Sequence, residues 1–298
     1  MKKILLTGAT GFLGSHLLKT LLKSEKYEII ALQRANSNFD KIEKLVKNYE
    51  QNLKLKFISI DEIYNIQHID IIIHTAINYG RGLKLSKILE TNLILPLKLL
   101  EHFATKGLEL FINTDTCFTK PSYSCMAHLG EYIISKKLLV MALGYNFDNI
   151  KIINMRLEHP YGEFDAKNKF SEKMIQDIAI KNIDFINLTH GEQRRDFVYV
   201  DDICSAYMTI LVNYQKYFFK FMTFEVGTGN AISIKEFVNE IKIISNSKTK
   251  LNFGALKYRD DEKMLLKANT NALKNWGWEA KYDYKTGLKQ IIHTYKMR

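Results

Sequence analysis

Residues 3–14 read KILLTGATGFLG, and this stretch decides the fold. Its first half is an apolar run that stops at Thr7, which is typical of a short buried strand. Apolar residues then recur at helical spacing from Phe12 to Lys23. The stretch therefore predicts a strand, a tight turn and a helix, with three glycines around the turn: Gly8, Gly11 and Gly14.

Each of these glycines has a physical role in such a turn. One permits the tight bend, another lets the backbone approach a pyrophosphate closely, and the third lets the helix pack on the strand. The N–H groups at the start of the helix are free to bind an anion. We therefore expect a dinucleotide here, in contact with the three glycines and with Thr10, Phe12 and Leu13.

Strands and helices alternate through the first half of the chain. We predict strands at 27–32, 53–60, 70–74, 109–113 and 151–156, and helices at 84–106 and 130–143. This order predicts an α/β fold with a Rossmann-type, doubly wound parallel sheet. Beyond residue 160 we expect helices at 170–181, 201–213 and 234–244, the last capped by Ser233, and strands at 197–200 and 221–226.

The looser second half predicts a smaller C-terminal lobe that binds the substrate. We expect a dinucleotide-binding domain at 1–160, to which residues 196–232 return. Residues 161–195 and 233–298 would form the smaller, substrate-binding lobe. A cleft beside such a sheet is the usual place for a ligand.

Composition narrows the class of protein. The 298 residues are 46% hydrophobic, which is enough for a sizeable core, and no apolar run is long enough for a membrane span. Three cysteines without framework spacing fit a reducing cytoplasm, and no metal-ligand spacing is visible. The net charge of +11 comes mainly from scattered lysines. We expect a cytoplasmic protein that binds no metal, nucleic acid or membrane.

The end of the second predicted strand bears on the choice of cofactor. An acidic residue there would bind the ribose 2′-hydroxyl of NAD, but the sequence has Gln33 and Arg34. An arginine can bind a 2′-phosphate instead. We therefore expect NADP, used as NADPH, rather than NAD. Thr75 and Ala76, which follow the fourth strand, are also expected to contact the cofactor.

Tyr132 and Lys136 are four residues apart on a predicted helix, so they share one face. A nearby ammonium lowers the pKa of a phenol, and such a tyrosine can exchange a proton with a substrate hydroxyl. Thr114, at the end of the fifth strand, can bond the same substrate oxygen. We predict these three residues to be catalytic.

The glycine motif and the Thr114–Tyr132–Lys136 set resemble those of the extended short-chain dehydrogenase/reductase family, also called the NAD-dependent epimerase/dehydratase family. Asn92 looks like that family's helix asparagine and is expected to help bind the cofactor. The resemblance covers nearly the whole chain. It implies hydride transfer at a sugar carbon of a nucleotide sugar, in a homodimer.

Within this family, the sequence favours one reaction over others. The 4,6-dehydratases carry Thr-Asp-Glu at the end of the fifth strand, whereas this chain has Thr114-Asp115-Thr116, which disfavours dehydration. Asp115 remains either an acid that contacts the substrate or a turn residue. Segments such as 154–159 and 191–197 are similar to nucleotide-sugar 4-ketoreductases of the CDP-abequose synthase type. That similarity implies NADPH-dependent reduction of the C4 ketone of a nucleotide-linked 4-keto-6-deoxy or 3,6-dideoxy hexose, for the surface sugars of an O-antigen.

Several polar residues are candidates for binding the substrate. Arg195 and Arg259 match family positions that hold the pyrophosphate and nucleotide, although either can instead form an ion pair. Asn168 matches an asparagine that contacts the diphosphate or base, and Arg81 is placed to reach the hexose. Arg156 lies inside a buried strand, so a structural ion pair is expected for it.

Two other functions stay open. A nucleotide-sugar 4-epimerase would hold NAD tightly and show no net redox change, and Gln33-Arg34 argues modestly against it. A dinucleotide sensor or an RNA-binding Rossmann protein would fit the basic charge. It would be expected to lack the Tyr132–Lys136 pair or to cluster base-stacking aromatics, and the sequence shows neither.

Overall fold

The computed structural model describes the chain from residue 1 to 297, except residues 81, 122–128, 146 and 148. Contacts divide it into two compact units. Unit 1 is Met1–Arg156 with Leu211–Phe224, and unit 2 is Leu157–Ile210 with Glu225–Arg298. In the described residues, no helix combines the length and the apolar character that crossing a membrane requires.

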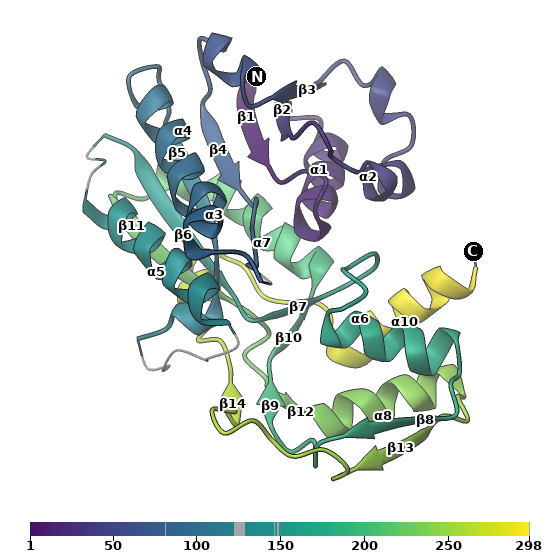
Figure 1. Cartoon of the computed structure of the whole chain (residues 1–298). Coiled ribbons are helices and arrows are strands. Elements are labelled where there is room, and N and C mark those ends of the chain that lie inside the picture. The colour runs from purple at the N-terminus through teal and green to yellow at the C-terminus, as the bar shows by residue number, and fades with distance from the viewer. Residues whose placement is uncertain (81, 122–128, 146, 148, 298) are drawn as a thin grey trace. The chain divides into compact units, whose positions relative to one another are not determined.

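The centre of unit 1 is a sheet whose strand order is β11-β6-β5-β4-β1-β2-β3 (Figure 1). The register is parallel at every junction from β5 through β4, β1 and β2 to β3. The order reverses at β1, where β4 and β2 lie on either side, as in a doubly wound fold. The strands are β1 (Lys2–Thr7), β2 (Tyr27–Gln33), β3 (Leu55–Ser59), β4 (Ile71–His74), β5 (Leu110–Thr116), β6 (Lys151–Leu157) and β11 (Phe221–Val226). The predicted fold class is confirmed.

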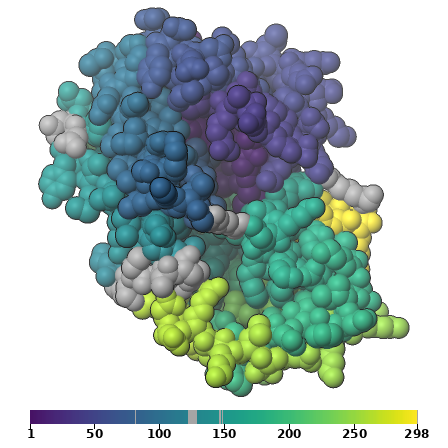
Figure 2. All heavy atoms as spheres, viewed as in Figure 1, coloured from purple at the N-terminus to yellow at the C-terminus, as the bar shows by residue number. Residues whose placement is uncertain are grey.

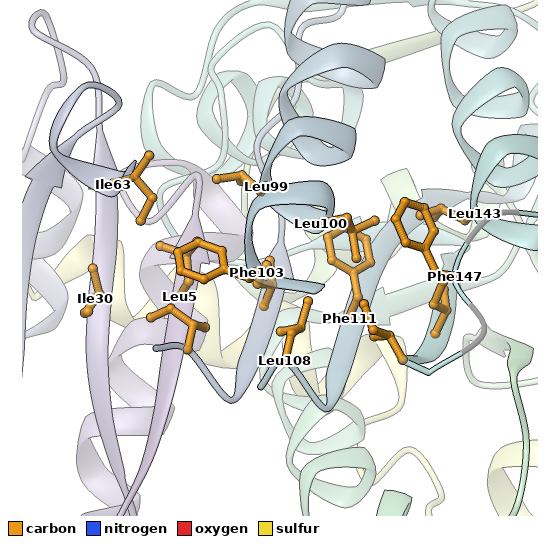
Figure 3. Packing of buried hydrophobic residues seen from close by; sticks show 14 of the residues in the cluster. Leu5, Ile30, Ile63, Leu99, Leu100, Phe103, Leu108, Phe111, Leu143 and Phe147 are labelled. Atoms are coloured by element: carbon orange, nitrogen blue, oxygen red, sulfur yellow. The ribbon is translucent and has the colours of Figure 1, made fainter. Parts of the chain in front are cut away.

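One face of the sheet packs against α4 (Leu95–Ala104) and α5 (Gly130–Tyr145). Leu5, Ile30 and Phe111 from three strands meet Leu99 of α4 and Leu143 of α5 in one buried cluster (Figure 3). Side chains alternate between faces along a strand, so the buried neighbours of Leu5 point to the other face. There α1 (Phe12–Ser24) buries its own leucines against β1 and β2.

The predicted helix at 84–106 is interrupted. It consists of α3 (Leu85–Leu89), a π-helical turn η3 (Glu90–Ile94) and α4. Pro96 lies in the first turn of α4 and has no N–H to donate to the carbonyl of Asn92, which accounts for the widened turn. The remaining short helices of unit 1 are α2 (Asp40–Leu45), η1 (Tyr49–Gln51), η2 (Glu62–Asn65), η4 (Cys117–Thr119) and η7 (Tyr214–Lys216).

Unit 2 is built from short paired strands and helices. The parallel pairs are β7 (His159–Tyr161) with β10 (Phe197–Tyr199), and β8 (Phe185–Leu188) with β13 (Lys250–Phe253). A small sheet joins β12 (Ile232–Ser233), β9 (Arg194–Arg195) and β14 (Leu265–Leu266). The helices are α6 (Phe170–Met174) with the π-helical η6 (Ile175–Ile180), α7 (Val200–Asn213, whose end belongs to unit 1), α8 (Ile234–Ser245), α9 (Asn271–Asn275) and α10 (Tyr284–Lys296).

The compact units and the predicted domains differ in the segment that returns to the sheet. We expected residues 196–232 to return, whereas contacts assign only 211–224 to unit 1. The physical reason is that β10 pairs with β7 of unit 2, so the chain leaves unit 2 only near the end of α7. The predicted domains themselves, 1–160 with 196–232 and 161–195 with 233–298, stay a prediction. Ser233 caps α8 through a reciprocal pair with Glu236, as expected from its position.

Candidate active site

The turn between β1 and α1 has room only for glycine at two positions. Gly8 has φ +72°, and a Cβ there would lie 2.6 Å from the Ala76 nitrogen. A Cβ on Gly14 would lie 2.0 Å from the Gly8 carbonyl oxygen, and the Gly11 N–H already donates to that oxygen at 2.8 Å. The backbone of the turn is therefore held tight against the end of β4, as a close pyrophosphate contact requires.

The start of α1 also suits an anion. Its N-cap is Gly11, which offers no capping side chain, and its first turn has no acidic residue. The N–H groups of that turn therefore keep their capacity for a bound phosphate. In the space-filling view, the purple N-terminal part of the chain reaches the surface beside blue atoms of later segments of unit 1 (Figure 2). Thr10, Phe12 and Leu13 are half-buried in the turn and the first helical residues.

The ends of β1 and β4 are fastened to each other beside this turn. The Thr75 hydroxyl donates to the Thr7 carbonyl at 2.7 Å, and the Ala76 N–H donates to the Thr7 hydroxyl at 3.2 Å. The same hydroxyl lies 2.9 Å from Nδ1 of the buried His74. Thr75 and Ala76 therefore line the turn, where the sequence predicted them to meet the cofactor. The residues present fit a dinucleotide.

Arg34 directly follows β2 and is exposed. Its N–H donates to the Ser37 hydroxyl at 2.9 Å, and the Ser37 N–H donates back to the Arg34 carbonyl at 3.0 Å. The backbone therefore turns sharply at this point and leaves the guanidinium in solvent. Of the residues that the structure describes, no acidic side chain forms an ion pair with it.

Tyr132 and Lys136 are both buried in α5. The Lys136 ammonium donates to the Thr114 carbonyl oxygen at 2.7 Å, which ties α5 to β5. Burial lowers the pKa of Lys136 to about 8, and the Asp115 carboxylate acts in the opposite direction. The Tyr132 ring packs against Tyr79, with 5.0 Å between the ring centroids.

The protonation of Tyr132 differs from the expectation. We expected Lys136 to lower its pKa, but burial raises it well above the ordinary value, and Tyr79 and Asp115 raise it further. The physical reason is that the phenol is out of water. Tyr132 therefore holds its proton at neutral pH.

Asp115 is held by the protein. Its Oδ2 accepts from the Thr119 hydroxyl at 2.6 Å, from Asn154 Nδ2 at 2.9 Å and from Arg156 Nε at 3.4 Å. Asn113, two residues earlier on the same face of β5, also donates to Asn154. The expected ion pair of Arg156 is thus present. That Asp115 contacts the substrate stays a prediction.

Thr116 is a residue whose place in the site the sequence reasoning missed. Thr116 is buried, and its hydroxyl lowers the pKa of Tyr132 against the larger effect of burial, while Thr114 is half-buried one residue before Asp115. The sequence offered one signal, the position two residues after Thr114 on the same strand. From the sequence alone, this position indicated only that a glutamate is absent there.

Asn92 lies in the π-helical turn and is fully buried. Its side-chain oxygen accepts from the Asn78 N–H, and its amide donates to the Asn78 carbonyl, both at 2.8 Å. The amide also donates to the Ser135 hydroxyl at 2.9 Å. Asn92 therefore joins the loop after β4 to α5 between Tyr132 and Lys136. Its predicted contact with the cofactor stays a prediction.

The predicted substrate residues of unit 2 fall into two places. The buried Arg195 forms a short ion pair with Glu262, whose N–H donates to the Arg259 carbonyl at 3.1 Å. Glu262 therefore links the Arg195 side chain to the backbone turn that begins at Arg259, and Arg259 itself is exposed. Asn168 is exposed just before α6, and no described contact joins it to that turn. Arg81 lies outside the described residues.

Several known proteins are similar to this chain. Residues 4–218 match the NAD dependent epimerase/dehydratase family. CDP-abequose synthase of Salmonella muenchen is 36% identical over 302 residues, which cover 98% of this chain and 97% of the relative. CDP-abequose synthase of Yersinia pseudotuberculosis is 28% identical over 88% of this chain and 90% of its own length. A solved structure of UDP-glucuronic acid 4-epimerase from Bacillus cereus, with UDP-glucuronic acid and NAD, gives a TM-score of 0.81 at 22% identity over 99% of both chains.

The family match spans most of the chain and includes the glycine turn, β5 and the Tyr132–Lys136 helix. The predicted family and the predicted class, an NAD(P)-dependent oxidoreductase, are confirmed. The chain therefore belongs to the NAD dependent epimerase/dehydratase family of enzymes.

Proposed function

We propose that the protein uses NADPH to reduce the C4 ketone of a nucleotide-linked 4-keto-6-deoxy or 3,6-dideoxy hexose. The observation that carries this proposal is Tyr132, a buried phenol that keeps its proton at neutral pH. A ketone that accepts a hydride needs one proton on its oxygen, and a protonated phenol supplies it. The 36% identity with a CDP-abequose synthase supports a nucleotide-linked deoxy sugar as the substrate class.

The chain's own residues account for most of this chemistry. In the proposed pose, the sugar carbonyl oxygen accepts hydrogen bonds from Thr114 and Tyr132. Reduced nicotinamide supplies the hydride when it is bound. Tyr132 gives its proton to the oxygen, and Lys136 stabilises the phenolate that remains and holds a cofactor ribose. Arg195, Arg259 and Asn168 of unit 2 are proposed to bind the nucleotide diphosphate. The predicted contact of Arg81 with the hexose is kept as part of the proposal.

The experiment is to mix the protein with NADPH and CDP-, TDP-, GDP- or UDP-linked 4-keto sugars and follow the nicotinamide absorbance. We expect NADPH oxidation with at least one of them, and a loss of at least about 100-fold in kcat for Tyr132→Phe. No oxidation with any of the four nucleotides would refute the proposal. The second candidate, a 4-epimerase with tightly held NAD, is favoured by the structural likeness to a 4-epimerase. An epimerase would convert a nucleotide-linked sugar with a C4 hydroxyl into its C4 epimer without added NADPH.

The choice of NADP over NAD rests on Arg34. Its exposed guanidinium follows β2, where an acid would bind the 2′-hydroxyl of NAD. We expect Arg34→Ala to weaken NADPH binding roughly 10- to 100-fold and to leave NADH binding unchanged, since one charged hydrogen bond to the 2′-phosphate is lost. Lys19→Gln removes one exposed charge from α1 and serves as the control. Equal losses for both cofactors would contradict the assignment.

We further propose that the protein is a homodimer in which α5 faces its partner. Ile134, Leu138, Met141 and Tyr145 are 42%, 38%, 61% and 80% exposed and recur at helical spacing. Such a stripe on one helix favours a second apolar surface of the same kind. Met141→Glu should shift the mass in solution from dimer to monomer. Ile243→Glu, at a 69% exposed position of α8, is the control, and a wild-type monomer would refute the proposal.

A further inference from the structure

Two polar atoms of the central sheet, His74 Nε2 and Asn113 Oδ1, are buried without a hydrogen-bond partner in the part of the chain that the structure describes. Both residues are 0% exposed. They lie on neighbouring strands, β4 and β5, and are partners in the parallel register, so their side chains share one face of the sheet. Because a buried polar atom almost always has a hydrogen-bond partner, these two atoms need an explanation.

The neighbours of His74 fix which ring nitrogen carries the hydrogen. The Thr7 hydroxyl accepts from the Ala76 N–H at 3.2 Å, and His74 Nδ1 lies 2.9 Å from the same hydroxyl. Of the described groups, Nδ1 is the only one to which this hydroxyl can donate. Burial lowers the pKa of His74 well below its ordinary value, so the ring is neutral at neutral pH. A neutral ring whose Nδ1 accepts carries its hydrogen on Nε2.

The neighbours of Asn113 fix its side-chain amide in the same way. Asp115 Oδ2 accepts from Asn154 Nδ2 at 2.9 Å, so Asn154 Oδ1 is left to accept from Asn113 Nδ2, at 2.7 Å. Since oxygen and nitrogen lie on opposite sides of an amide, Asn113 Oδ1 points away from β6 and toward β4. The His74 ring stacks on Phe111 of β5, two residues before Asn113, with 6.2 Å between the ring centroids. A donor of His74 and an acceptor of Asn113 therefore face the same space.

We propose that one internal water binds in this space, where it accepts from His74 Nε2 and donates to Asn113 Oδ1. The two atoms do not bond each other directly, and a buried water typically bridges two to four polar groups that would otherwise lack partners. With this water, one continuous row of hydrogen bonds crosses β4, β1, β5 and β6. Every bond in the row points the same way, and its members in order are Ala76, Thr7, His74, the water, Asn113, Asn154 and Asp115.

The two ends of the row lie at the carboxyl ends of the strands, where ligands bind in such sheets. Ala76 lies against the glycine turn, since a Cβ on Gly8 would come within 2.6 Å of its nitrogen. Asp115 directly follows Thr114 and also accepts from Thr119 at 2.6 Å. Hydrogen bonds that run in one direction polarise and strengthen one another. The water therefore joins the glycine turn to Asp115 in one network, and this inference does not depend on which reaction the enzyme catalyses.

The first test is a high-resolution crystal structure of the wild-type protein. We expect one water oxygen at about 2.7–3.2 Å from both His74 Nε2 and Asn113 Oδ1, the ordinary length of such hydrogen bonds. A direct hydrogen bond between the two side chains would overturn the proposal. A space between them that holds no water density would overturn it as well.

The second test is ¹⁵N NMR of the histidine rings in the wild-type protein, assigned through the backbone. We expect the hydrogen of His74 on Nε2, and the same form from about pH 6 to about pH 8. The ring of His68 is exposed and bonds the Lys106 carbonyl and Asp70, so its resonances should change with pH and serve as the internal reference. A hydrogen on Nδ1 of His74 would overturn the proposal.

The third test removes the acceptor with Asn113→Leu and uses Asn187→Leu as the matched control. Asn187 accepts from Asn252 at 3.1 Å, so each variant breaks one bond between two asparagines, but Asn187 is exposed. We expect the Nε2 resonance of His74 to shift in Asn113→Leu and to stay in place in Asn187→Leu. An Nε2 resonance that Asn113→Leu leaves unmoved would overturn the proposal. If Asn113→Leu does not fold, the two measurements on the wild-type protein decide it.

Discussion

Replacing Gly14 with alanine tests whether the turn between β1 and α1 needs a glycine at this position. The added Cβ would lie 2.0 Å from the Gly8 carbonyl oxygen and 2.9 Å from the Ala9 Cα, against an ordinary contact of at least 3.4 Å. The first turn of α1 would have to move about 1.4 Å from the end of β1 to relieve the first overlap. The atoms in the way are backbone, so no side chain can rotate aside. Overpacking of this severity costs ~3 kcal/mol or more.

This cost translates into a measurable melting shift. At about 2.1 cal/mol/K per residue, the 298-residue chain loses roughly 1 °C in Tm for every 0.6 kcal/mol, so Gly14→Ala should melt at least about 5 °C lower. The same displacement withdraws N–H groups from the pyrophosphate, so NADPH binding, followed by fluorescence, should weaken at least tenfold. Gly144→Ala, where a Cβ meets nothing within 4 Å, is the control and should bind normally. A Gly14→Ala protein with wild-type Tm and Kd would refute the reasoning.

Three further predictions concern charged and buried groups. Because the pKa of Lys136 is lowered to about 8, its ammonium loses its proton as the pH rises through that value. We therefore expect kcat/KM for reduction to fall about tenfold per pH unit above it. A kcat/KM that stays flat to about pH 9.5 would contradict this. Asp196 is buried and accepts hydrogen bonds from the Thr228 N–H at 2.8 Å and from the Thr228 hydroxyl at 2.6 Å, among other donors. Asp196→Asn should therefore lower the free energy of unfolding by ~3 kcal/mol, measured by urea unfolding. A loss under about 1 kcal/mol would be inconsistent with that network. Burial raises the pKa of Glu172, and the Tyr295 hydroxyl donates to its carboxylate at 3.0 Å. The stability that Glu172 contributes is therefore present at low pH and is lost as the pH rises through its folded pKa. The Tyr295 hydroxyl donates to the charged carboxylate, so Tyr295→Phe should lower the Tm more at pH 8 than at pH 5. A larger loss of Tm at pH 5 would contradict this expected pH dependence.

Much of unit 1 was predictable because its signals are local. The apolar run before Gly8 and the helical spacing after it fix β1 and α1 within a residue or two. The buried strands were found for the same reason, since a parallel sheet covered on both faces needs continuous apolar runs. The π-helical turn at Asn92 was missed, although Pro96 four residues later was a visible warning.

The details of the site depend on contacts that sequence spacing does not carry. Arg195 pairs with Glu262, 67 residues away, and no local pattern selects that partner. Thr116 influences the pKa of Tyr132 only because β5 and α5 come together in three dimensions. Local reasoning gave the wrong direction for the pKa of Tyr132, because it saw the lysine four residues on and not the burial. The short strands of unit 2 have two to four residues each, too few for a periodic pattern.

In the proposed reaction, a hydride goes to C4 of a keto sugar and a proton goes from Tyr132 to its oxygen. The most direct measurement uses NADPH deuterated at the transferred position of its nicotinamide, together with a CDP-linked 4-keto-3,6-dideoxyhexose. NMR of the product then locates the deuterium. We expect deuterium on C4 and one NADPH consumed for each sugar reduced. A reduced sugar without deuterium on C4, or a keto sugar left unreduced with no NADPH consumed, would contradict it.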